Sequence, residues 1–149
     1  MSRAVLEANH PRLKRATYGI SSPVDPGYNC IAYAAGDNDR WWWPFQGLNQ
    51  AYWPAGAPRE LTLEAFVAAY ATIGYAPCAD GDVEAGYEKI AIFTDPQGKP
   101  THAAKQLPSG RWTSKMGPQE DINHSLYGVQ GPPYGEVAQY VKRKMTPIT

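Results

Sequence analysis

The sequence predicts a single α+β domain over residues 1–149, with a small antiparallel sheet of about three or more strands packed against helices. One observation is a run of apolar residues at helical spacing, which predicts a helix over Leu61–Ile73. Another is a series of three β-rich runs separated by turn signals, and these runs are Lys89–Phe93, Thr101–Leu107 and Arg111–Met116. We expect the three runs to form an antiparallel meander.

The predicted helix over Leu61–Ile73 has clear start and stop signals. Thr62 is a good N-cap residue, Glu64 lies in the first turn where the helix dipole favours an acid, and Gly74 is a standard stop. Two more helices are expected towards the end of the chain. One is a short helix within Asp121–Leu126, and the other is an amphipathic helix over Tyr134–Met145 with cations in its last turn.

Composition excludes several classes of function. Fourteen Lys and Arg residues balance fourteen Asp and Glu residues, so the net charge is zero and we expect no nucleic-acid or membrane partner. The chain shows neither a membrane-spanning apolar run nor the apolar core of a signal peptide. Its two cysteines are too few for a disulfide framework, which predicts free thiols in the cytoplasm. A disulfide between Cys30 and Cys78 stays open, as does secretion of an effector without a signal peptide.

The stretch around Cys30 is the main candidate for chemistry. Asn29 is a good N-cap residue, the apolar residues that follow favour a short helix, and Gly36 is a plausible stop. Cys30 would then be the first helical residue, where unpaired amides and the dipole favour a thiolate. The alternative is a buried, inert cysteine, because cysteine is among the most buried residue types.

Three consecutive tryptophans, Trp41, Trp42 and Trp43, follow this helix. They cannot all face one core from a regular element, so we expect at least one ring at a surface or in a cleft. One interpretation is an aromatic wall that binds substrate beside Cys30, together with Asn29. The other is a loop that folds over the core with its rings turned inward.

Nucleophilic cysteine chemistry also needs a base near the thiol. His102, at the start of the second predicted strand, is the preferred base, and a third polar group usually orients such an imidazole. Asp121 is the preferred orienting residue, with Glu120 as an alternative. Depending on the strand register, Thr113 and Lys115 or else Ser114 would share a sheet face with His102.

The other histidines and the acidic residues give weaker candidates. His124 competes with His102 for the role of base, and on a helical turn it would face Asp121. His10 lies in a polar segment and is interpreted as a surface residue. The cysteines and histidines lack zinc-site spacing, and the acidic loop Asp80–Glu84 lacks the spacing of an EF-hand. We therefore expect no metal and no cofactor.

The order of these parts resembles the papain-like cysteine hydrolases of bacteria, meaning the NlpC-type peptidases and CHAP-type amidases. A cysteine opens a helix, and a packing helix, a Gly81-Asp82 loop, the apolar strand Lys89–Phe93 and a histidine strand follow. A second resemblance, to a group of uncharacterised bacterial domains, covers most of the chain. It rests on four short motifs, which are Tyr28-Asn29-Cys30-Ile31-Ala32-Tyr33-Ala34, Trp42-Trp43-Pro44, Thr101-His102-Ala103-Ala104 and Trp112-Thr113-Ser114-Lys115.

The first resemblance implies a papain-like arrangement in which a Cys30–His102 pair cleaves or transfers an acyl group. The chain departs from that family in two ways, because it has no export signal or wall-binding repeat and no obvious third polar residue. We hypothesise a thiol hydrolase or acyl transferase that acts on the amide bond of a peptide or similar substrate. One alternative is a non-catalytic binding or regulatory module, and another is an effector or toxin that modifies a protein.

Overall fold

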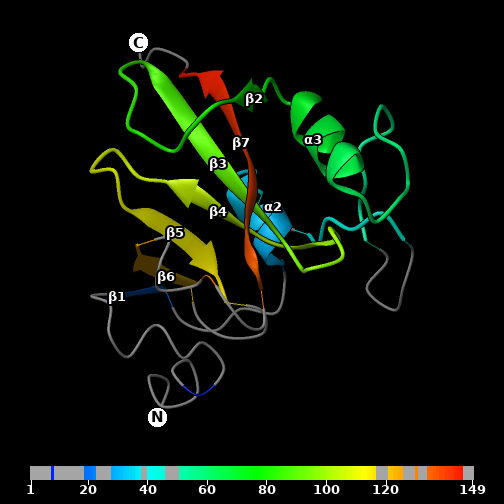
Figure 1. The fold of residues 1–149 in the computed structure, drawn as a ribbon, viewed down its shortest axis with the longest axis horizontal. Coiled ribbons are helices and arrows are strands. Elements are labelled where there is room, and N and C mark those ends of the chain that lie inside the picture. Colours follow the sequence, from blue (N-terminus) through cyan, green and yellow to red (C-terminus); the bar gives the residue numbers. More distant parts are fainter. Residues whose placement is uncertain are drawn as a thin grey trace.

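The computed structural model describes residues 8, 19–22, 28–37, 40–45, 51–116, 121–125, 130 and 134–145. This part of the chain forms one seven-stranded antiparallel sheet and two short helices (Figure 1). The strands lie in the order β1-β6-β5-β4-β3-β7-β2. Their bounds are β1 Gly19–Ser22, β2 Ala76–Cys78, β3 Tyr87–Thr94, β4 Pro100–Gln106, β5 Trp112–Lys115, β6 Asp121–His124 and β7 Glu136–Lys144.

The α+β, papain-like fold prediction is wrong, because the described residues form a β-rich fold. The expected meander is present as β3, β4 and β5, but it forms only the middle of a larger sheet. The range Tyr134–Met145, expected to be a helix, contains β7. The range Asp121–Leu126, also expected to contain a helix, begins with β6.

Strand β7 shows why helical spacing was a misleading signal. Val137 and Val141 are four residues apart, which suits one helix turn, but in β7 a register shift against β3 places their side chains against different cores on opposite faces of the sheet. In the structure β7 pairs with β3 along its length and with β2 on its other side. Its cations pair with carboxylates, Lys142 with Glu84 in the loop before β3 and Arg143 with Glu88 in β3. Tertiary pairing therefore determines the conformation of this segment.

Both predicted helices near the sheet are confirmed, each with its predicted cap. Helix α2 spans Cys30–Ala34 and contacts β4 and β5, whereas α3 spans Leu63–Ala71 and lies beside β2 and β7 (Figure 1). The cap side chains accept backbone N–H groups, Asn29 from Ala32 and Thr62 from Ala65. Among the described residues, neither helix has the length and apolar character needed to cross a membrane.

The sheet is buried on both faces. On the side of the helices the core includes Cys30, Ile31, Trp42, Trp53, Phe66, Tyr70, Ile90, Ile92 and Ala103. On the other side it consists of Ala91, Phe93, Ala104, Trp112, Met116, Ile122 and Tyr134. Residues that alternate along β3 and β4 thus enter two separate cores.

Gly135 fixes the entry into β7. Its φ of +85° lies in the left-handed region, and a Cβ there would overlap the carbonyl oxygen of Thr94. We expect Gly135→Ala to lower the free energy of unfolding by about 3–5 kcal/mol, because conformational strain and overlap add. Gly98→Ala is the matched control, with a φ of +83° and open space around its Cβ position. It should cost only about 1–2 kcal/mol. Urea unfolding of both variants measures the difference, and equal losses would contradict the packing argument.

Candidate functional site

Cys30 is the first residue of α2 and lies with its thiol against the middle of the sheet. The residue is 9% exposed and belongs to the core on the helix side. Its position follows from Asn29, whose side chain caps the helix and also holds a distant loop. The Asn29 carboxamide donates to the carbonyl of Trp42 over 2.8 Å and accepts the Trp42 amide over 3.1 Å.

Opposing effects set the ionisation of the Cys30 thiol. Burial is the largest, and it raises the thiol pKa to about 11. Hydrogen bonds from the backbone of Ala103, Ile31 and Cys30 itself act in the other direction, as does the positive charge of Lys115. The sequence suggested a low-pKa thiolate at a helix start, but burial outweighs the amides here, and the resting group is a thiol.

The contact with Ala103 shows where the sulfur lies. Strand β5 pairs with β4 only at Lys105 and Gln106, so the edge of β4 near Ala103 has no β5 partner. Backbone amides of a strand point sideways in the plane of the sheet, towards the neighbouring strand, and not towards the faces of the sheet. The sulfur of Cys30 therefore lies at this edge of β4, beside the residue that follows His102.

His102 is fully buried within β4, and its ring packs against aromatic side chains. It stacks on Tyr134 with the ring centroids 3.8 Å apart and meets the edge of Phe93 at 5.2 Å. Both aromatic residues belong to the core on the side away from α2. The structure thus brings Cys30 to the backbone next to His102, while the described contacts of the imidazole ring lie with the second core.

Tyr134 lies near both the Cys30 thiol and the His102 ring, and the sequence analysis did not identify it as a site residue. Burial raises the pKa of its phenol well above the usual value, and the negative charge of an ionised Cys30 raises it further. The carbonyl of Tyr134 accepts a hydrogen bond from the hydroxyl of Thr101, next to His102. The thiol, the phenol and the imidazole stacked on it are therefore electrostatic neighbours. No sequence pattern indicates the contact of Tyr134 with His102.

The candidate orienting residues are distributed over both sheet faces. The observed register pairs Lys105 with Thr113, so Ser114 shares the side of His102 and Lys115 the side of α2. Asp121 begins β6 and pairs with Lys115 through the backbone, and its side chain lies outside the described part of the structure. Glu120 and His10 also lie outside the described residues.

His124 has partners other than Asp121. Its Nε2 lies 2.6 Å from Ser114 Oγ and its Nδ1 2.7 Å from the carbonyl of Ser125. Since a carbonyl only accepts, Nδ1 donates to Ser125. The predicted pairing of His124 with Asp121 required a helix, and β6 replaces that helix. Ser114 and His124 form a fully buried polar pair on the side of the second core.

The tryptophans mostly follow the interpretation of a loop folded over the core. Trp42 is buried, stacks on Tyr70 at 6.2 Å and donates its indole N–H to Asp37. Trp43 and Trp41 are half-buried, and the Trp43 ring meets Phe66 edge-on. Asn29 acts here through its cap and its bonds to the Trp42 backbone.

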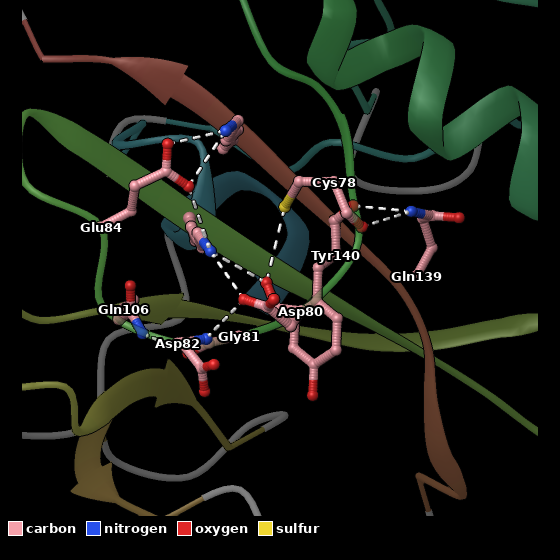
Figure 2. A network of polar contacts seen from close by, with 10 residues as sticks. Cys78, Asp80, Gly81, Asp82, Glu84, Gln106, Gln139 and Tyr140 are labelled. Atoms are coloured by element: carbon pink, nitrogen blue, oxygen red, sulfur yellow. Dashed lines mark hydrogen bonds and ion pairs between the residues drawn. The ribbon is translucent and has the colours of Figure 1, made fainter.

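The carboxylates of the acidic loop Asp80–Glu84 bind lysine ammonium groups from β3 and β7 (Figure 2). Buried Lys89 donates to the carbonyl and the carboxylate of Asp80, both over 3.1 Å, and Lys142 binds both carboxylate oxygens of Glu84. Cys78 also donates to the Asp80 carbonyl, over 3.6 Å. The described residues contain no group of three or more side chains suited to a metal ion. Both cysteines are free thiols.

The comparisons with known proteins give one family. The model of the family described as a domain of unknown function, DUF7689, matches residues 19–142. The chain belongs to the DUF7689 family. No curated protein and no solved structure matches it significantly. The matched range of the DUF7689 chain covers the entire sheet to within two residues of the end of β7.

The bonds of Asn29 predict its contribution to the stability of this DUF7689 chain. Asn29→Ala removes a helix cap and leaves the buried N–H and C=O of Trp42 without their carboxamide partner. We expect a loss of about 2–4 kcal/mol in the free energy of unfolding. Thr62→Ala, which removes only the cap of α3, is the control and should cost about 1 kcal/mol. Chemical denaturation compares the two, and an Asn29→Ala loss no larger than the control would refute the proposed anchoring.

Proposed function

We propose that this protein is a thiol-dependent hydrolase or acyl transferase that acts on an amide bond, with Cys30 as nucleophile and His102 as base. The observation that supports this most strongly is the position of the Cys30 sulfur. It is held by backbone amides from two elements, and one of them belongs to Ala103, the residue after His102. Amides grouped around a nucleophile are also what a tetrahedral oxyanion requires.

The chemistry divides into two steps. The sulfur attacks the amide carbon while the imidazole takes the thiol proton, and the oxyanion is stabilised by backbone N–H groups. The C–N bond then breaks, the imidazolium gives its proton to the leaving amine, and a thioester remains on Cys30. Water cleaves this thioester in a hydrolase, whereas an amine or a hydroxyl group takes the acyl group in a transferase.

The raised thiol pKa defines how this site would operate. With a pKa of about 11, almost all of the Cys30 side chain is protonated at neutral pH. Attack then has to be coupled to proton transfer, which makes a base more important than in enzymes with a preformed thiolate. We assign that base to His102, whose neighbour Ala103 lies beside the sulfur at the edge of β4. Two free thiols suit the reducing cytoplasm, where we place this activity.

Covalent trapping with a peptide-like electrophile tests this proposal. A peptidyl vinyl sulfone forms a thioether with a nucleophilic cysteine, and intact-protein and peptide mass spectrometry locate the adduct. We expect one adduct on Cys30 in the parent protein and in Cys78→Ser, and none in Cys30→Ser. His102→Asn should slow the labelling by about 10²–10⁴-fold, the usual contribution of a general base.

The burial of both Cys30 and His102 favours the rival interpretation of a non-catalytic module. That interpretation predicts adducts on the more exposed Cys78 alone, with the same labelling in Cys30→Ser as in the parent. Labelling of Cys30 that does not respond to His102→Asn would refute the assigned base. Melting curves of the variants ensure that a loss of labelling is not a loss of fold.

A further inference from the structure

The sheet face that carries Cys30 also carries a buried lysine. Lys115 ends β5 and is only 1% exposed, an uncommon position for a cation. The neighbour two positions earlier in β5 shows which face of the sheet the Lys115 side chain is on. The Thr113 hydroxyl lies 2.9 Å from the hydroxyl of Tyr33 in α2. Lys115 therefore shares the α2 side of the sheet with Thr113.

The residue before the N-cap of α2 contacts this lysine. The Nζ atom of Lys115 lies 5.1 Å from the ring centroid of Tyr28, two residues before Cys30. The Tyr28 ring stacks on Tyr33 at 5.8 Å, so β5 and the start of α2 are joined by two tyrosines. The ammonium is almost fully buried beneath the Tyr28 ring, and charge interactions are stronger where water is excluded.

The imidazole of His102 has a different environment. Its described ring contacts, Phe93 and Tyr134, belong to the core on the far side of the sheet. An ionised Cys30 raises the pKa of two neighbouring phenols, those of Tyr70 from α3 and of Tyr134, so both stay neutral beside the sulfur and supply no positive charge. Among the described groups, Lys115 is the cation that shares the Cys30 side of the sheet and acts on its charge.

We propose that Lys115, on the same sheet face as the start of α2, supplies the positive charge that stabilises the Cys30 thiolate. In many thiol enzymes an imidazolium has this role. Here the two tasks are divided: Lys115 offsets the charge of the sulfur, and His102 transfers the proton. Lys115 is thus a positioning residue that acts through Cys30. The catalytic use of this division rests on the proposed function. The effect of Lys115 on the ionisation of the Cys30 thiol, however, is measurable in the protein without substrate.

The test is the alkylation rate of Cys30 by iodoacetamide at fixed alkaline pH, followed by mass spectrometry in a Cys78→Ser background. Lys115→Met removes the charge and keeps the length of the side chain. We expect about tenfold slower alkylation, which corresponds to a rise of one unit in the thiol pKa. Lys115→Arg keeps the charge and should restore a rate close to that of the parent.

Lys105→Met is the matched control. Lys105 pairs with Thr113 across the strands and shares its sheet side, but it is partly exposed and bound to Glu88 over 3.1 Å. Its replacement should leave the Cys30 rate unchanged. If Lys115→Met does not fold, as judged by near-ultraviolet circular dichroism, Lys115→Gln replaces it with the same expected loss.

Three results would overturn the proposal: a parent-like rate in the neutral Lys115 variants, an equal loss in Lys105→Met, or an arginine variant as slow as the methionine variant. Each concerns the free thiol and is read without any substrate. If the Lys115 prediction fails, the trapping of Cys30 by a peptide-like electrophile still stands as an independent result. Failure of that trapping likewise leaves the effect of Lys115 on ionisation intact.

Discussion

The contact between the Cys30 sulfur and the backbone of β4 is the interaction on which the site depends. It forms because β5 separates from β4 beyond Lys105 and leaves a strand edge whose amide needs an acceptor. Helix α2 is short, and its packing on β4 and β5, not its own length, holds its first residue there. Asn29 completes the arrangement, since one carboxamide caps the helix and binds the Trp42 backbone.

The position of the Cys30 sulfur against β4 has a chemical consequence. The contacts that place the sulfur also remove it from water, and desolvation outweighs the hydrogen bonds that would favour a thiolate. A protected thiol of this kind resists indiscriminate oxidation and alkylation. The arrangement suits a nucleophile that becomes reactive only when a substrate and a base complete the site. Both faces of the surrounding sheet are buried, and an ionised Cys30 raises the pKa of one phenol in each core, Tyr70 and Tyr134.

Local signals predicted local structure well in this chain. The caps Asn29 and Thr62, the two helices that they begin, and the three strands β3 to β5 all follow from adjacent residues. The fold class did not follow, because β7 is defined by pairing with β3, about fifty residues earlier, and its apolar spacing fits a helix equally well. The α+β prediction failed because two segments predicted as helices contain the strands β6 and β7.

The candidate site shows the same division between local and distant information. Cys30 and its cap could be found from the sequence, because capping is a property of neighbouring residues. The side of the sheet on which Ser114 and Lys115 lie depends on a single residue of register in the turn before β5, and no local pattern fixes that register. Tyr134 was missed because its contact with His102 joins positions thirty-two apart in the sequence.

Hydrogen exchange at the Ala103 amide tests the central claim most directly, because that amide has the Cys30 sulfur as its acceptor in this account. In the parent protein the amide should exchange slowly. In Cys30→Ala it should exchange much faster, while the amide of Ala91, in the neighbouring strand β3, keeps its rate. Unchanged protection of Ala103 after removal of the sulfur would show that Cys30 is not seated on β4, and would contradict the site described above.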